Sequence, residues 1–129
     1  TGRPRRCGHL DLPALRYAVR VNGLHAFAMT KIDVLAGMEM KLCVAYELDG
    51  ERLDEPPPDA ADVARIKPVY ESIEGFTGDL TSARKVEDLP KSVRAYIERI
   101  ERETDCPINL ISVGPDREQT IALENPFGA

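Results

Sequence analysis

The stretch Leu24-His25-Ala26-Phe27-Ala28-Met29-Thr30-Lys31-Ile32-Asp33 decides how this chain is interpreted. Its first six residues are mostly apolar and predict a strand buried in a sheet. Its last four place a threonine, a lysine and an aspartate directly behind that strand. Ligands of open α/β sheets bind at the carboxyl ends of strands, so this junction predicts an α/β fold with a binding site at this position.

Asp33 at the end of such a strand is suited to guanine. The N1–H and exocyclic N2–H₂ of guanine are adjacent donors, and one ionised carboxylate accepts from both. Adenine has an acceptor at N1 and would leave the carboxylate unpaired, at a cost of about 1–3 kcal/mol. The Lys31 stem can lie against the purine ring while its ammonium group stays solvated. The alternative interpretation is a strand end with two solvated charges, because Thr-Lys-x-Asp is short enough to recur by chance.

A second strand-to-turn junction lies near the other end of the chain. Pro107-Ile108-Asn109-Leu110-Ile111 predicts a short buried strand, which runs into Ser112-Val113-Gly114-Pro115. Gly114 allows a close backbone approach or a positive φ, and Pro115 ends the strand because it cannot donate to a neighbouring one. We expect the peptide groups of residues 112–114 to meet the edge of a base, in a cleft shared with Asp33. An ordinary turn is the alternative.

The N-terminal stretch Thr1-Gly2-Arg3-Pro4-Arg5-Arg6-Cys7-Gly8 is an island of positive charge in an acidic chain. Three arginines within four positions, with a proline between them and glycines on both sides, predict a compact anion-binding loop, since arginine pairs bidentately with carboxylates and phosphates. The alternative is a frayed basic tail. Because like charges repel, we expect residues 1–6 to be mobile without a ligand.

Composition limits the class of protein. The chain has 129 residues, 43% hydrophobic and 30% charged, which is enough for one globular domain. Its net charge of −5 argues against nonspecific binding to nucleic acid, which needs a basic face. No apolar run approaches the roughly 20 residues of a membrane span, so we expect no membrane partner. Cys7, Cys43 and Cys106 are widely spaced, which predicts no zinc site and a cytoplasmic setting.

Local patterns predict the elements. Asp11 as an N-cap, Pro13 in the first turn and Asn22-Gly23 as a stop predict a helix over 11–21. Apolar residues around most of its circumference predict burial on more than one side. Alternation predicts a strand over 40–48, followed by a hairpin turn at Asp49-Gly50. The remaining expected elements are strands over 24–29, 51–53, 66–73 and 108–112, a loop over 75–87 and a helix over 90–104.

Together, these runs resemble the C-terminal portion of the adenylosuccinate synthetase family. The resemblance lies in the arginine-rich start, the Thr-Lys-x-Asp junction, the Ser-Val-Gly-Pro turn and the runs between them, in an order that spans nearly the whole chain. One departure is His9, where the family usually has tryptophan after Cys-Gly. The resembling runs cover residues 1–8, 10–12, 14–23, 30–35, 43–46 and 111–121.

The resemblance implies an α/β fold with a mixed sheet and flanking helices, as the C-terminal part of a P-loop-type nucleotide-dependent synthetase. It implies that the full-length enzyme joins L-aspartate to IMP at the expense of GTP, with Mg²⁺, as a cytoplasmic homodimeric ligase of AMP (purine nucleotide) biosynthesis. It assigns GTP contacts to Arg5, Lys31, Ile32, Asp33, Ser112, Val113 and Gly114. It assigns the loop for aspartate and IMP to Thr1, Gly2, Arg3, Pro4 and Arg5.

The chain lacks the parts of that enzyme which perform its chemistry. No phosphate loop of the form G-x-x-x-x-G-K-[ST] occurs, and no catalytic residue or metal ligand is assigned in residues 1–129. We therefore expect residues 1–129 to form one guanine-nucleotide- and aspartate-binding portion that makes no adenylosuccinate alone. The alternative, from a different class, is a non-catalytic guanine-nucleotide-binding or interaction module, which would hold guanine nucleotide by itself.

Overall fold

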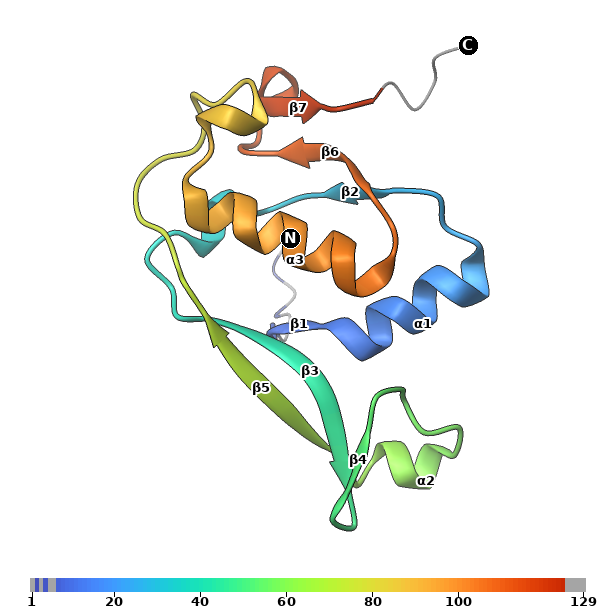
Figure 1. Ribbon diagram of the computed structural model, residues 1–129. Coiled ribbons are helices and arrows are strands. Elements are labelled where there is room, and N and C mark those ends of the chain that lie inside the picture. The colour runs from blue at the N-terminus through green and yellow to red at the C-terminus, as the bar shows by residue number, and fades with distance from the viewer. Residues whose placement is uncertain (1, 3, 5–6, 125–129) are drawn as a thin grey trace.

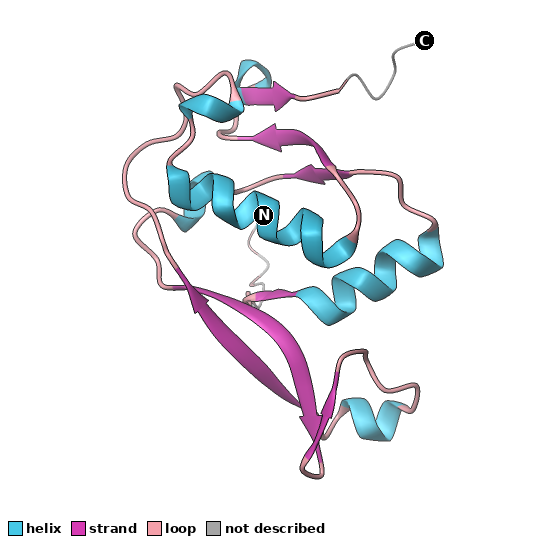
Figure 2. Cartoon of the chain, in the orientation of Figure 1, coloured by secondary structure: helices cyan, strands magenta, loops and turns pink. Residues whose placement is uncertain are grey.

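The computed structural model describes residues 2, 4 and 7–124, which form an α/β fold with two small mixed sheets (Figures 1 and 2). The α/β class and the mixed pairing predicted from the sequence are confirmed, with the strands divided between two sheets. The elements in chain order are β1 (Leu10–Asp11), α1 (Leu12–Asn22), β2 (Phe27–Met29), η1 (Asp33–Leu35), β3 (Met40–Leu48), β4 (Glu51–Leu53), α2 (Ala60–Val63), β5 (Lys67–Ile73), η2 (Val86–Asp88), α3 (Lys91–Thr104), β6 (Ile108–Ser112), η3 (Arg117–Gln119) and β7 (Thr120–Ala122).

The first sheet is built around β3, the longest strand. β1 pairs with β3 in parallel, whereas β4 and β5 pair with it antiparallel. The edge strand expected over 66–73 is confirmed as β5, where Pro68 lies opposite Tyr46. Proline is tolerated there because β5 pairs only with β3 within the described chain.

The second sheet holds the two junctions singled out from the sequence. β2 and β6 are parallel neighbours, with Met29 opposite Ile111, and β7 adds an antiparallel strand on the far side of β6. In Figure 1, α1 and α3 lie between this sheet and the first one. Ile108 and Ile111 of β6 are buried in one aliphatic core together with Val93, Ile97 and Ile100 of α3.

The predicted ends of α1 are confirmed, but its surroundings differ from the expectation. The Asp11 carboxylate accepts from the N–H of Ala14 at 2.9 Å, and Gly23 closes the helix with a φ of +58°. The prediction that this helix is buried on more than one side is wrong, because its residues Tyr17 and Val21 are 46% and 56% exposed. One face of α1 is therefore apolar and uncovered.

β2 begins at Phe27 rather than at Leu24, so the predicted strand was too long by three residues. The N–H of Leu24 donates to the carbonyl of Val19 at 3.1 Å, as does the N–H of Gly23. Leu24 thus belongs to the end of α1 and is not available to the sheet. The sequence pattern alone does not distinguish an apolar residue that ends a helix from one that opens a strand.

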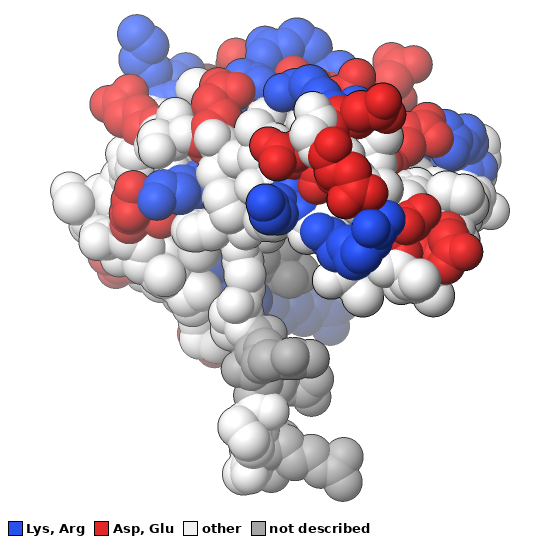
Figure 3. Space-filling model, turned by 90° about the horizontal axis from the view of Figure 1, so that it is seen from below, with Lys and Arg blue, Asp and Glu red and all other residues white. Residues whose placement is uncertain are grey.

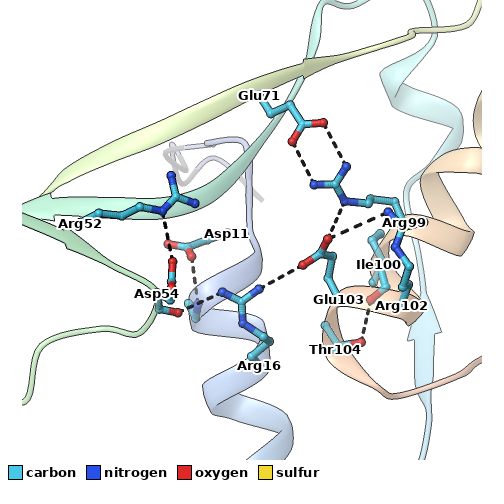
Figure 4. Close-up of polar contacts among 11 residues, drawn as sticks. Asp11, Arg16, Arg52, Asp54, Glu71, Arg99, Ile100, Arg102, Glu103 and Thr104 are labelled. Atoms are coloured by element: carbon cyan, nitrogen blue, oxygen red, sulfur yellow. Dashed lines mark hydrogen bonds and ion pairs between the residues drawn. The ribbon is translucent and has the colours of Figure 1, made fainter.

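The helix α3 is fastened to its neighbours by a network of ion pairs (Figure 4). Arg99 donates to both carboxylate oxygens of Glu71 on β5, at 3.0 and 2.9 Å, and its Nε lies 2.9 Å from Glu103. Glu103 also pairs with Arg16 of α1, whose guanidinium donates to the carbonyl of Asp54. The network joins α1 and α3 to the first sheet.

Charged side chains of both signs are interspersed on the face shown in Figure 3, seen from below. No helix among the described residues is long and apolar enough to cross a membrane.

Candidate functional site

The parallel pairing of β2 and β6 brings the two predicted binding runs to the same end of the second sheet. Because Met29 lies opposite Ile111, residues 30–33 and residues 112–114 both follow the carboxyl ends of adjacent strands. Carboxyl ends of neighbouring parallel strands are where open α/β sheets hold ligands. The structure therefore brings together two runs that are about 80 positions apart in the sequence.

Lys31 and Asp33 are held at the surface by the residue between them. The Ile32 side chain is buried in the core and only 1% exposed, which anchors the loop. Lys31 is exposed and adopts a φ of +65°, and Asp33 is half-buried at the first position of η1. The loop thus presents a lysine and a carboxylate on a fixed backbone, with Ile32 serving as the anchor.

Residues 112–119 form a turn that is held together by hydrogen bonds among its own residues. The Ser112 hydroxyl donates to the carbonyl of Gly114 at 3.0 Å, and the N–H of Val113 donates to the carbonyl of Gln119 at 2.8 Å. The N–H of Asp116 donates to the side chain of Gln119 at 3.0 Å. Val113 is fully buried, so its contribution to a ligand is limited to its backbone.

Gly114 is closely packed against a side chain of this chain, whereas we expected a close approach to a ligand or a positive φ. The possibility of a positive φ at Gly114 is wrong, because Gly114 is not one of the described glycines that have a positive φ. A Cβ at this position would instead collide with the carboxamide of Gln119 and press on Thr81. The missing side chain thus makes room for the internal Gln119 contact, which shapes the turn.

A cleft of about 710 Å³ connects the N-terminal segment with the loop after β2. Its walls come from residues 7–11, from α1, from residues 30–31, 34–35 and 38–41, and from Tyr96 of α3. Neither Asp33 nor Ser112, Val113 or Gly114 lines it, so it is not the cleft that we expected Asp33 and residues 112–114 to share. The residues that follow the arginine-rich stretch therefore share a cleft with Lys31.

The arginine-rich stretch falls mostly outside the described residues, which exclude Thr1, Arg3, Arg5 and Arg6. The structure therefore does not test the expected mobility of this stretch or its predicted contacts with aspartate, IMP and GTP, which stay predictions. Gly2 and Pro4 are described and exposed, and Gly2 has a φ of +67°. The stem of this stretch is fixed where His9 packs edge-on against Tyr70, with ring centroids 5.2 Å apart. The histidine that departs from the usual tryptophan thus contacts β5.

Two supporting side chains were missed from the sequence. The Tyr46 hydroxyl donates to Asp11, lying 2.7 and 2.6 Å from its two oxygens, and ties the start of α1 to β3. No local pattern signals this contact, because the residues are 35 positions apart. Gln119 could have been found, since Asp116-x-x-Gln119 has the spacing of a capping box, which the structure confirms.

Among residues 2, 4 and 7–124, no group of three or more His, Cys, Asp or Glu is arranged to hold a metal ion. The available chemistry is that of recognition: a carboxylate, an ammonium group and backbone groups at the end of a parallel strand pair, beside a cleft. This arrangement is typical of the ligand-binding end of an open α/β nucleotide-binding sheet.

Comparisons with known proteins identify the family. The sequence profile described as adenylosuccinate synthetase matches residues 1–121. The chain is 55% identical, over all of its length, to adenylosuccinate synthetase from Anaeromyxobacter sp. (strain Fw109-5), and 48% identical, over 98% of its length, to that from Myxococcus xanthus (strain DK1622). It spans about 30% of the length of these relatives.

A solved structure is also similar. The structure of fully ligated adenylosuccinate synthetase from Plasmodium falciparum matches 93% of this chain with a TM-score of 0.87 and 37% sequence identity, again over 30% of that protein. The chain belongs to the adenylosuccinate synthetase family.

Proposed function

We propose that this chain is the guanine- and aspartate-binding portion of an enzyme that joins L-aspartate to IMP at the expense of GTP. The observation that carries the proposal is the parallel pairing of β2 and β6, which brings residues 30–33 and 112–114 to one end of the sheet. The proposal includes the setting of the family: AMP biosynthesis, a homodimer of the full-length enzyme, and the cytoplasm, where the buried thiols Cys43 and Cys106 stay reduced.

Each recognition residue has a role that suits its chemistry. Asp33 accepts from N1–H and N2–H₂ of guanine, and the stem of Lys31 covers the purine face. Backbone groups of Ser112, Val113 and Gly114 face the edge of the base. We assign GTP contacts to these residues, to Ile32 through its backbone, and to Arg5.

The arginine-rich loop is proposed to bind the other two substrates. Its residues Thr1, Gly2, Arg3, Pro4 and Arg5 would hold aspartate and approach IMP. Guanidinium groups grip a dicarboxylate bidentately and offset charge that develops on a transferring phosphoryl group. We assign the ligands of Mg²⁺, and the groups that move protons, to the remainder of the synthetase.

The proposal is tested by exchanging this chain into a relative. In the Myxococcus xanthus synthetase, the matching 128 residues are replaced by residues of this chain, and adenylosuccinate formation is measured. We expect product only when IMP, GTP and aspartate are all present, and none from the isolated chain. A chimera that melts like its parent but makes no product contradicts the proposal. Tight binding of GTP by the isolated chain would favour the binding-module alternative.

The role of the arginine-rich loop is tested by Arg3→Leu in the same chimera. Loss of a bidentate contact to a carboxylate costs about 1.5–3 kcal/mol, so kcat/KM for aspartate should fall by roughly 10- to 150-fold. The KM for GTP should change little. Unaltered aspartate kinetics would remove Arg3 from the site.

A further inference from the structure

Gly114 is packed against two side chains that come from different parts of the chain. A Cβ added to Gly114 would collide with the Gln119 carboxamide and would lie 3.1 Å from the methyl carbon of Thr81. Gly114 is buried, although it belongs to a turn. In Figure 1, the yellow segment that leads into α3 lies beside the turn between β6 and β7. The turn after β6 is therefore supported both by its own η3 and by the segment before α3.

Gln119 bonds to residues on both sides of the Gly114-Pro115 pair. Its backbone carbonyl accepts from the N–H of Val113 at 2.8 Å, and its N–H donates to the carbonyl of Asp116 at 2.9 Å. Its side-chain oxygen accepts from the N–H of Asp116 at 3.0 Å. Any residue at position 119 can make the first two bonds, whereas the third needs an acceptor on a side chain of this length. A substitution of Gln119 thus removes one defined support of the turn.

Thr81 is held in place by the polar groups of its own turn. The Asp79 carboxylate accepts from the N–H of Thr81 at 2.8 Å and from its hydroxyl at 2.7 Å. These two bonds hold the pKa of the Asp79 carboxyl below its ordinary value. The Arg84 guanidinium donates to the Thr81 carbonyl at 2.7 Å, and Leu80 is buried in the core. The polar groups of Thr81 are engaged in these bonds, so its methyl group is the part that packs against Gly114.

The turn that these two residues support offers a ligand its backbone more than its side chains. The Ser112 hydroxyl is engaged with the Gly114 carbonyl, and the Val113 side chain is buried. Recognition by residues 112–114 therefore depends on where their backbone lies. A binding group of this kind must be held by neighbours whose own positions are fixed by packing and hydrogen bonds. Gln119 and Thr81 meet that requirement.

We propose that Gln119 and Thr81 are positioning residues for the guanine base of GTP. They fix the Gly114-Pro115 corner, so that the backbone of residues 112–114 meets the base at one place. The proposal rests on the proposed function, which assigns base contacts to that backbone. Neither side chain has to touch the nucleotide, and their effect is on the affinity for GTP rather than on the chemical step.

Kinetics of two Gln119 variants in the chimera described above test the proposal. Gln119→Leu removes the acceptor for the Asp116 N–H, so the KM for GTP should rise by roughly 2- to 12-fold, the equivalent of about 0.5–1.5 kcal/mol. Gln119→Glu keeps an oxygen at that place and should keep the KM for GTP within about two-fold of the parent's. In both variants, kcat and the KM values for IMP and aspartate should stay at the parent's values.

Thr81→Ser tests the other support. It removes only the methyl group next to Gly114 and keeps the hydroxyl that bonds to Asp79. The KM for GTP should rise by roughly 2- to 4-fold, since the loss of one methyl contact is equivalent to at most about 0.8 kcal/mol. Should Gln119→Leu fail to fold, Thr81→Ser decides, because it keeps every hydrogen bond of this region.

Asn109→Leu is the matched control for Gln119→Leu. The Asn109 carboxamide belongs to the same sheet and donates to Glu124 at 3.1 Å, but it lies near the start of β6. This substitution should leave the KM for GTP unaltered. An equal rise in the KM for GTP in Asn109→Leu and Gln119→Leu contradicts the proposal.

The remaining outcomes separate positioning from stability. Gln119→Leu or Thr81→Ser with the parent's KM for GTP overturns the role proposed for that residue, even where melting temperature and kcat both fall. A Gln119→Glu chimera as impaired as Gln119→Leu shows that the bond to Asp116 does not position the turn, and overturns the role of Gln119. A folded parent chimera that makes no adenylosuccinate contradicts the proposed function, and the proposal falls with it. An active parent with unaltered variants contradicts the positioning alone.

Discussion

The backbone of Lys31 adopts a φ of +65°, which costs a non-glycine residue about 1–2 kcal/mol. Asp49 and Asp105 are the other described non-glycine residues with positive φ, and aspartate tolerates this conformation better than lysine does. Strained residues of this kind concentrate at functional sites, where the surrounding structure holds them in place. The strain supports a binding role for the loop after β2, and no sequence pattern predicts it.

Lys31→Gly should therefore change stability and binding in opposite directions. Relief of the strained φ, about 1–2 kcal/mol, exceeds the cost of the larger entropy of glycine in the unfolded chain, about 0.5–1 kcal/mol, so we expect the isolated chain to gain up to about 1 kcal/mol. In the chimera, loss of the stem over the purine should raise the KM for GTP. Urea unfolding and GTP kinetics measure the two effects.

Asp105→Gly is the control for Lys31→Gly, since Asp105 also has a positive φ but ends α3. It should change stability in the same direction and leave GTP kinetics unaltered. A Lys31→Gly chimera with the parent's KM for GTP would remove this side chain from the guanine site.

Tyr46 gives the chain a defined sensitivity to alkaline pH. Burial, followed by the hydrogen bond to Asp11, raises the pKa of the Tyr46 phenol above its ordinary value. The folded state therefore holds this proton more tightly than the unfolded state, so the stability it provides is complete below pH 10 and is lost as pH rises above about 10. Tyr96, whose pKa burial also raises, acts in the same sense.

Tyr46→Phe should lower the free energy of unfolding at pH 7 by about 1.5–3 kcal/mol, because a hydrogen bond to a charged carboxylate is lost. It should also make the loss of stability above pH 10 shallower than in the parent chain. Denaturant unfolding at pH 7 and pH 11 checks both. Tyr17→Phe, at an exposed position, is the control, and an equal effect of the two substitutions would show that the Asp11 contact contributes nothing.

At the scale of elements, sequence signals within a helix or strand predicted that helix or strand. The N-cap at Asp11, the stop at Gly23 and the alternation over Met40–Leu48 located α1 and β3, because each signal lies within the element it defines. The two-residue β1 and the three-residue β7 were missed, since their only support is pairing with β3 and with β6. The short helix α2 was missed because the prolines before Asp59 suggested a loop, although Asp59 is a good N-cap.

The candidate site was predictable in part for the same reason. The runs at 30–33 and 112–114 are recognisable as strand ends, which together with the family resemblance led us to expect a shared cleft. The pairing of β2 with β6 as parallel neighbours was not predicted from the sequence. The contact between Gly114 and Gln119, and the anchoring of the loop by Ile32, depend on packing across elements. Residue spacing carries no information about either contact.

Gly114→Ala should distort the turn after β6. The new methyl group would meet the Gln119 side chain and Thr81, and overpacking of this kind costs typically 1–3 kcal/mol. We expect thermal unfolding of the isolated chain at a lower temperature and, in the chimera, a raised KM for GTP. Gly8→Ala is the control for stability, since a Cβ there meets nothing within 4 Å. Equal melting temperatures for the two variants would contradict the packing explanation.

At the scale of the whole molecule, the described residues include a region joined by ion pairs and a region with exposed apolar side chains. The ion-pair network of Arg16, Arg99 and Glu103 fastens the two helices to the first sheet (Figure 4). Two of the exposed apolar side chains, Tyr17 and Val21, lie on the uncovered face of α1.

The central claim is that Asp33 recognises guanine, and Asp33→Asn in the chimera tests it most directly. The substitution turns one acceptor oxygen into a donor that faces a donor, so kcat/KM for GTP should fall by roughly 5- to 150-fold, the equivalent of about 1–3 kcal/mol. The KM values for IMP and aspartate should change little. Asp105→Asn, at the exposed end of α3, should alter none of these constants. A Asp33→Asn chimera that uses GTP as efficiently as its parent would contradict the account.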